Sequence, residues 1–187
     1  MDQLITAIKS VMPLLIAEWN NTKLSQFEQL VEQPFAQYFE GRQTQEKTKM
    51  VAPILDSVFA RLMKPILPGF DVDEGKGRDY IWDTIPLESK ITFGSGKSWT
   101  GNGYAKTPWH ILMRFEITED GVIVGYFATL VNLDNCASKW TVPPADKAKT
   151  SNFSTLTFLK EDHQHLLPIH GEFTAKNKYL NPEMISV

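Results

Sequence analysis

An apolar run near the middle of the chain reads Trp109-His110-Ile111-Leu112-Met113-Arg114-Phe115-Glu116-Ile117. Its length and its apolar character predict a strand that is largely buried. A turn signal, Glu119-Asp120-Gly121, follows it, and the run from Val122 to Leu133 predicts the partner strand of a hairpin. This hairpin indicates a β-sheet at the centre of the fold.

Three helices are predicted before the sheet. Residues 2–19 carry apolar side chains at the spacing of an amphipathic helix, and Pro13 within them predicts a bend or a split. A second apolar face runs from Phe27 to Phe39, with Gly41 as a stop signal. A third helix is predicted from about Gln45 to Met63. The N-terminal third of the chain is therefore expected to be helical.

Strand-like segments follow the helices. They are expected at about 78–83, 86–93 and 154–159, with a polar loop over 134–152 and a mostly irregular tail. This order predicts an α/β fold with an α+β-like sequence of elements, in which helices flank a mixed central sheet.

Length and composition indicate an ordinary globular chain. With 187 residues, the chain is expected to form a single domain over 1–187, with a helical part at 1–66 and a sheet part at 67–187. Hydrophobic residues make up 42% and the net charge is −3, which argues against a protein that simply coats nucleic acid. The one cysteine excludes an internal disulfide and a Cys-rich zinc site. No apolar run is long enough for a membrane span, and a cytoplasmic location is expected.

A charged grouping stands out between Glu74 and Lys90. Glu88 and Lys90 share one face of a predicted strand, because side chains two positions apart point the same way. If Asp79 lies on the paired strand, its carboxylate reaches the same place. Two carboxylates and an ammonium group suit a hard divalent cation and metal-assisted cleavage of a phosphodiester.

This segment resembles the active-site signature of the PD-(D/E)xK nuclease superfamily, and especially that of type II restriction endonucleases. The resemblance implies a restriction-endonuclease-like fold and a Mg²⁺ ion, replaceable by Mn²⁺, bound by Asp79, Glu88 and the Ser89 carbonyl. Lys90 would position the attacking water. The implied activity is that of a phosphodiester hydrolase, a Mg²⁺-dependent site-specific deoxyribonuclease acting on a short palindromic site.

Several alternatives remain open at this stage. Asp83 is a rival for the first acid, and Glu74 is a candidate for a further upstream acid. Asp79, Glu88 and Lys90 could instead form a salt-bridge set on a hairpin. A structure-specific or repair nuclease, and a non-catalytic module that binds DNA or a protein partner, are the competing functions.

A donor-rich segment follows the Glu-x-Lys strand. No acid occurs from Ser89 through Phe115, and the glycines within this stretch allow a close approach to a ligand. Hydroxyl, amide and amine side chains suit contacts with phosphates and base edges. The candidate DNA-binding residues are Lys97, Ser98, Thr100, Asn102, Tyr104 and Lys106.

The expected partners follow from the resemblance. They are double-stranded DNA, a second copy of the chain in a homodimer, and a cognate DNA methyltransferase in the same host. His110 is expected to be a core residue or to support the site.

Overall fold

The computed structural model describes residues 1–23, 44–73, 78–94, 98–102, 107–118, 121–141, 153–173 and 179–180. The predicted helix over Phe27–Phe39 and its stop at Gly41 lie outside these ranges, as do Glu74, Lys97, Tyr104 and Lys106. No described helix combines the length and the apolar character needed to cross a membrane.

The described helical elements come mainly at the start of the chain. They are α1 (Asp2–Glu18), the π-helical turn η1 (Trp19–Lys23), α4 (Thr44–Ile66) and the short 3₁₀ helices η2 (Leu133–Asn135) and η3 (Lys160–His165). The strands are β1 (Phe70–Val72), β2 (Tyr80–Trp82), β3 (Ile85–Phe93), β4 (Ser98–Asn102), β5 (Trp109–Ile117), β6 (Ile123–Asn132), β7 (Phe153–Thr157), β8 (Leu166–His170), β9 (Glu172–Phe173) and β10 (Tyr179–Leu180).

Six strands form one mixed sheet in the order β1-β2-β3-β5-β6-β8. Strands β3 and β5 run parallel, and the neighbouring described pairs run antiparallel. Strands β4 and β7 form a separate antiparallel pair. The predicted α/β fold with a mixed sheet and helices is confirmed, whereas a single domain over 1–187 stays a prediction.

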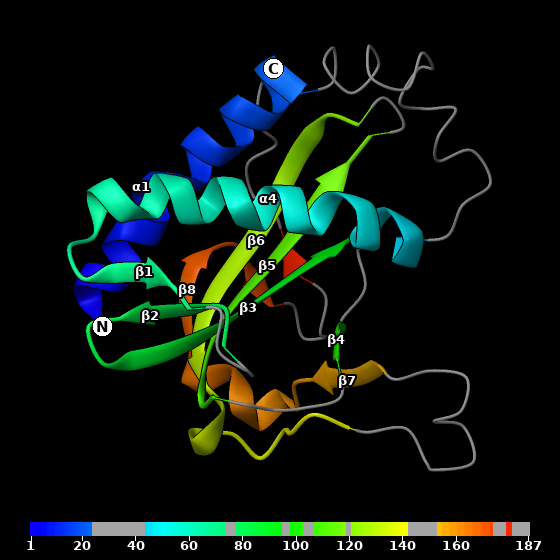
Figure 1. Cartoon of the computed structure of the whole chain (residues 1–187). Coiled ribbons are helices and arrows are strands. Elements are labelled where there is room, and N and C mark those ends of the chain that lie inside the picture. The colour runs from blue at the N-terminus through cyan, green and yellow to red at the C-terminus, as the bar shows by residue number, and fades with distance from the viewer. Residues whose placement is uncertain are drawn as a thin grey trace.

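Helices α1 and α4 cover one face of the sheet (Figure 1). In α1 the buried positions recur at helical spacing, so one stripe of the helix faces the sheet. Ile111, Met113 and Phe115 of β5 point toward this first core and are fully buried. The intervening residues of β5 therefore point to the opposite face.

The opposite face of the sheet carries a second core, formed around the β4–β7 pair. It comprises Trp99, Leu112, Phe127, Val131, Leu133, Cys136, Leu156 and Phe158. Because Glu88 pairs in register with His110, and Lys90 with Leu112, both charged residues of β3 lie on this second-core face. The sheet thus separates an apolar face under the helices from a face that carries the charged residues.

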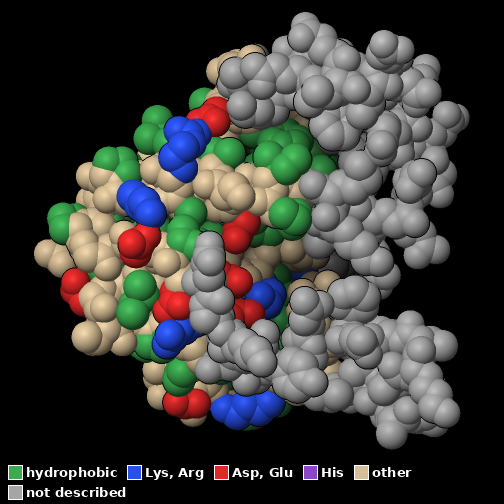
Figure 2. Space-filling model, viewed as in Figure 1, with side chains coloured by type: hydrophobic (Ala, Val, Ile, Leu, Met, Phe, Trp, Pro, Cys, Tyr) green, Lys and Arg blue, Asp and Glu red, His purple; other side chains and the backbone are tan. Residues whose placement is uncertain are grey.

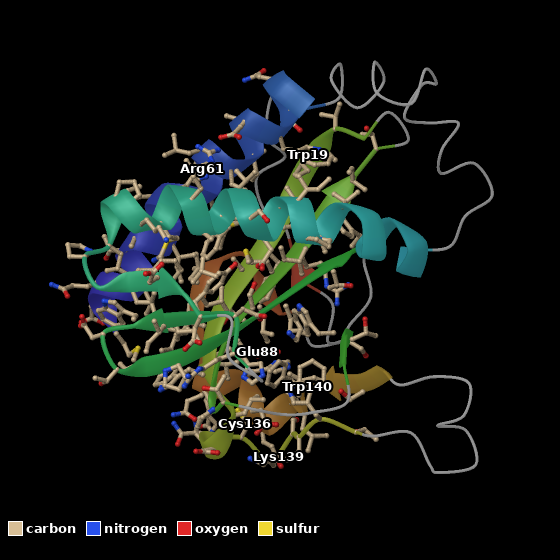
Figure 3. All side chains as sticks on the ribbon, in the orientation of Figure 1. Trp19, Arg61, Glu88, Cys136, Lys139 and Trp140 are labelled. Atoms are coloured by element: carbon tan, nitrogen blue, oxygen red, sulfur yellow. The ribbon has the colours of Figure 1, made fainter. Side chains whose placement is uncertain are left out.

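Two polar contacts fasten the helices to the sheet and to each other (Figure 3). The Trp19 indole donates to the Gly121 carbonyl at 2.8 Å. This hydrogen bond holds the end of α1 to the segment just before β6. Arg61 of α4 forms an ion pair with Glu18 of α1. The two helices are therefore fixed in place beside β6.

Three sequence predictions differ from the structure. Helix α1 continues through Pro13, so the predicted split is wrong, while a bend there stays a prediction; the buried stripe on both sides of Pro13 stabilises the helix by more than the roughly 3 kcal/mol that proline removes. The segment from Ser98 to Asn102, for which no strand was predicted, is a strand because it pairs with β7. The tail contains β8, which pairs with β6 and is an edge strand of the six-stranded sheet, a position where Pro168 is tolerated.

A buried carboxylate fixes the segment after η2. Asp162 accepts hydrogen bonds from the amides of Ala137 and Ser138, at 2.7 and 2.8 Å, and from the Ser138 hydroxyl. Burial acts to raise the pKa of Asp162, but these hydrogen bonds outweigh it and lower the pKa below its ordinary value. The charged form of Asp162 is therefore the one that stabilises the fold.

We expect Asp162→Asn to lower the free energy of unfolding by about 2 kcal/mol at pH 7, because the amide accepts fewer hydrogen bonds than the carboxylate. A carboxyl with a lowered pKa stabilises the fold above its unfolded pKa and loses this contribution as the pH falls through the folded value. Urea denaturation at pH 7 and at pH 3 checks this, and the difference between the two proteins should shrink at pH 3. An equal difference at both values would contradict it.

Candidate functional site

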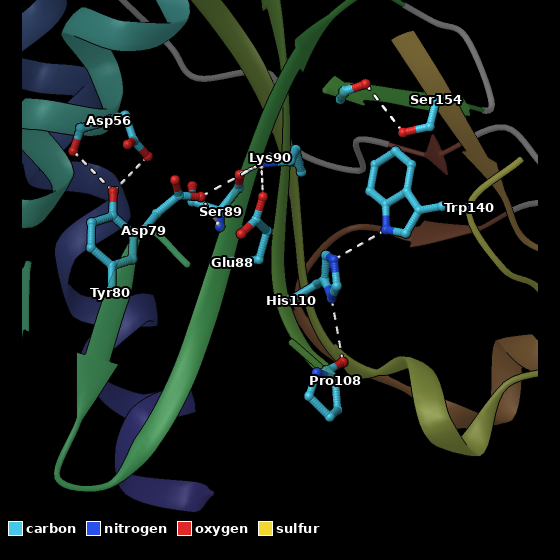
Figure 4. A network of polar contacts seen from close by, with 11 residues as sticks. Asp56, Asp79, Tyr80, Glu88, Ser89, Lys90, Pro108, His110, Trp140 and Ser154 are labelled. Carbon is cyan, nitrogen blue, oxygen red and sulfur yellow. Dashed lines mark hydrogen bonds and ion pairs between the residues drawn. The ribbon is translucent and has the colours of Figure 1, made fainter. Parts of the chain in front are cut away.

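The structure brings the three sequence-predicted residues Asp79, Glu88 and Lys90 together (Figure 4). Lys90 and Glu88 form an ion pair, and the Lys90 Nζ lies 3.5 Å from the Asp79 Oδ2. The Asp79 carboxylate accepts the Ser89 amide at 2.7 Å, which ties the segment before β2 to the middle of β3. A face of the molecule on which charged side chains of both signs gather is shown in Figure 2.

Lys90 is the centre of this cluster. Its Nζ donates to the Ser89 carbonyl at 2.7 Å in addition to pairing with Glu88. Glu88 has only 8% of its side chain exposed, and its Oε2 accepts no hydrogen bond within the described structure. The Lys90 ammonium is therefore the main neutralising partner of a buried carboxylate.

A third carboxylate, Asp56 of α4, lies behind the cluster and was missed at the sequence level. The Tyr80 hydroxyl donates to the Asp56 Oδ1 at 2.5 Å. Burial raises the pKa of Asp56, and burial together with the negative charge of Asp56 raises the pKa of Tyr80 well above its ordinary value. The sequence held one indication of this role. Asp56 lies three and four residues before the buried Phe59 and Ala60, so it shares their face of the helix.

A neutral histidine lies on the other side of Lys90. His110 Nε2 accepts a hydrogen bond from the Trp140 indole at 3.2 Å, so the proton of the ring is on Nδ1, which faces the Pro108 carbonyl at 3.3 Å. Burial lowers the pKa of His110 to about 4, and the positive charge of Lys90 acts in the same direction. The neutral His110 ring therefore accepts the hydrogen bond that positions Trp140.

The β4–β7 pair, which we call the ribbon (Ser98–Asn102 and Phe153–Thr157), lies directly beside the cluster. A Cβ added to Gly101 would lie 3.0 Å from Lys90 Cε and 3.3 Å from the Trp140 ring. Gly101 thus allows the ribbon to lie against Lys90 and Trp140. Glu88 and Trp140 can be located in Figure 3.

One face of the ribbon carries four hydroxyl groups. Ser98 pairs with Thr157 and Thr100 with Thr155 in the antiparallel register, so all four side chains point the same way. They point away from the second core, because the intervening Trp99 and Leu156 are buried in it. The Ser98 and Thr157 hydroxyls form a hydrogen bond of 2.5 Å with each other.

Arg114 holds the start of the ribbon. Its guanidinium donates to the carbonyls of Gly94 and Ser98, at 3.0 and 2.5 Å, and lies 4.9 Å from the centre of the Trp99 ring. Arg114 is 2% exposed. Of the six predicted DNA-binding residues, Ser98 and Thr100 lie on the hydroxyl face, and Asn102 ends β4. The other three lie outside the described residues.

Comparisons with known proteins identify no family. No family model and no curated protein matches the chain. XiaF from Streptomyces sp., solved in complex with FADH2 and glycerol, is 15% identical with a TM-score of 0.26, and the match covers 97% of this chain and 51% of XiaF. The HsaA monooxygenase from M. tuberculosis is 14% identical with a TM-score of 0.27, with coverage of 96% and 55%. The chain spans about half the length of both proteins, and TM-scores this low transfer neither a fold nor a flavin to it.

The predicted identity as a type II restriction endonuclease is wrong. The solved structures found in the comparison are XiaF and a monooxygenase, and neither is described as a nuclease. The predicted Mg²⁺-dependent phosphodiester hydrolysis and the structure-specific nuclease alternative are corrected together with that identity. The physical reason is that Lys90 forms ion pairs with both Asp79 and Glu88, as in the salt-bridge alternative, so the three charges neutralise one another.

The predicted Mg²⁺ site, with Mn²⁺ as a substitute, is corrected as well. Within the described ranges, no three His, Cys, Asp or Glu side chains are grouped so that they could hold a metal ion. The Ser89 carbonyl, predicted as a metal ligand, accepts the Lys90 ammonium instead. Asp83, the rival first acid, lies in the turn between β2 and β3 and has no part in the cluster's hydrogen bonds and ion pairs described above.

Proposed function

We propose that this chain binds double-stranded DNA through the hydroxyl face of the ribbon. The observation that carries the proposal is the register of Ser98 with Thr157 and of Thr100 with Thr155, which aligns four hydroxyls on one face of a two-stranded antiparallel pair. A two-stranded β-ribbon is one of the elements that fit the major groove of B-form DNA. Serine and threonine hydroxyls both donate and accept hydrogen bonds, so they suit base edges and phosphate oxygens.

The ribbon has the support that a binding element needs. Trp99 and Leu156 anchor its inner face in the second core, and Arg114 holds its first residue through the Ser98 carbonyl. Gly101 lies against the methylene groups of Lys90, so the ribbon packs directly on the charged cluster. A supported element loses little conformational freedom when it binds, which favours affinity.

The net charge of the chain bears on the expected affinity for DNA. At a net charge of −3, non-specific attraction to phosphates is small, so the affinity depends mainly on the local contacts of the ribbon and falls only weakly as salt is raised. A homodimer would place two ribbons on two half-sites and is part of the proposal. A methyltransferase partner follows only from a restriction enzyme, so it is not part of the proposal.

We expect the double substitution Thr100→Val and Thr155→Val to weaken DNA binding about tenfold, because it removes two hydroxyls while keeping the β-branched shape that the strands prefer. The measurement is fluorescence anisotropy of a labelled 30-base-pair duplex of random sequence, at about 50 mM salt and at higher salt. Ser57→Ala, which removes an exposed hydroxyl on α4 that bonds to the Pro53 carbonyl, is the matched control and should bind as the unmodified protein does.

Two results would overturn the proposal. One is the absence of duplex binding at low salt. The other is an affinity that the ribbon substitutions leave unchanged. Duplex RNA of the same sequence should bind less tightly, because its major groove is too narrow for side chains to reach the bases.

A further inference from the structure

A cavity distant in the fold from the ribbon lies at the start of α1. It has a volume of about 650 Å³, within the range of small-molecule sites, and lies between the first turns of α1, the α4–β1 connection and the β2–β3 turn. Figure 1 shows the N-terminal end of the chain beside β1 and β2. The cavity shares no lining residue with the charged cluster or the ribbon.

The lining combines an apolar wall with hydrogen-bond acceptors. Ala7, Leu67 and Trp82 contribute apolar surface, and Asp2 and Asp83 contribute two carboxylates. No Lys or Arg is among the described residues that line it. Asp2 lies in the first turn of α1, where its charge offsets the positive end of the helix, and the Asp83 carboxylate attracts a positively charged group.

The Asp83 carboxylate packs against the backbone of Gly69, while the residue itself is exposed. Asp83 has a φ of 53°, its amide donates to the Gly69 carbonyl at 2.9 Å, and a Cβ on Gly69 would lie 2.1 Å from the Asp83 Oδ1. Gly69, at a φ of 81°, thus leaves the space that the carboxylate occupies. A carboxylate at the edge of an apolar wall is suited to bind the ammonium group of an amphipathic molecule.

We propose that this cavity binds an organic amine, with its ammonium group against Asp83 and its apolar body against Trp82. Gln3, Thr6 and Ser10 of α1 add polar groups that face the same cavity. The site is independent of the proposed DNA binding, because it is built from other elements.

Titration with dansylcadaverine, a fluorescent primary amine, tests the proposal on the full chain. We expect saturable binding, and at least tenfold weaker binding of dansylamide, which carries the same fluorophore without the ammonium group. Asp83→Asn should weaken dansylcadaverine about fivefold, because it removes the charge while asparagine tolerates the left-handed backbone. Asp134→Asn, an exposed acid in η2 outside the cavity, is the matched control.

A second variant tests the cavity itself. Thr6 is exposed and lines the cavity, so Thr6→Trp fills it without disturbing the core and should weaken both fluorophores. Equal affinity for the two fluorophores would overturn the proposal, as would binding that neither Asp83→Asn nor Thr6→Trp weakens.

Discussion

Replacing Lys90 by methionine is expected to lower the free energy of unfolding by about 3 kcal/mol at pH 7. Methionine keeps the length and the apolar stem but removes the ammonium group that pairs with Glu88 and approaches Asp79. The Glu88 carboxylate, with 8% of its side chain exposed, is then left without that partner. Removing one member of a buried ion pair typically costs 3–5 kcal/mol, and the partial exposure of Lys90 and Asp79 places this case at about the lower end.

Urea denaturation followed by circular dichroism measures the effect. The double variant Lys90→Met with Glu88→Gln should recover at least half of the loss, because the uncompensated charge is gone. Lys64→Met is the matched control, since Lys64 pairs with Asp71 on the surface with 50% and 62% of the two side chains exposed. Its expected effect is under about 1 kcal/mol. A loss as small for Lys90→Met as for Lys64→Met would show that the cluster does not stabilise the fold.

Lowering the pH from 7 to 4 is expected to destabilise the protein by about 3 kcal/mol through His110 alone. The pKa of His110 falls from 6.5 to about 4 on folding, and burial is the largest cause. Between these two pH values the unfolded chain binds a proton at His110 and the folded chain does not. The contribution of His110 is therefore complete above pH 6.5 and is lost as the pH falls toward 4. Protonation would also remove the acceptor of the Trp140 indole.

A comparison with His110→Gln isolates this effect. Glutamine can accept from the Trp140 indole but does not titrate. The two proteins differ at residue 110 alone, so the contributions of all other residues cancel in the difference between the two stability curves. Denaturation at pH 7, 6, 5 and 4 should show a steeper loss for the unmodified protein. Parallel curves for the two proteins would contradict the assignment of His110 as a neutral, buried acceptor.

The local parts of the site were predictable from the sequence. Asp79, Glu88 and Lys90 meet because a short hairpin and the alternation of side chains along a strand fix their positions, and both are local rules. Asp56 and Trp140 reach the same region through long-range packing, which no short-range rule specifies.

The central hairpin was predictable for the same reason, since β5 and β6 are adjacent in sequence and strongly apolar. Strand β4 was not predictable, because its pairing with β7 depends on a distant partner and its glycine, Gly101, disfavours a strand. The function was misread because a carboxylate pair beside a lysine has two physical solutions. One is a metal site, and the other is a set of ion pairs that neutralise one another.

The ribbon joins segments far apart along the chain, since the Ser98 and Thr157 hydroxyls that bond to each other are 59 residues apart. Closing so long a loop carries an entropic cost, so we expect β4 and β7 to pair late in folding and to open before the six-stranded sheet does. A molecule that contacts both strands of the ribbon at once would also hold this loop closed. Slower amide hydrogen exchange in β4 and β7 would then accompany occupancy of the hydroxyl face.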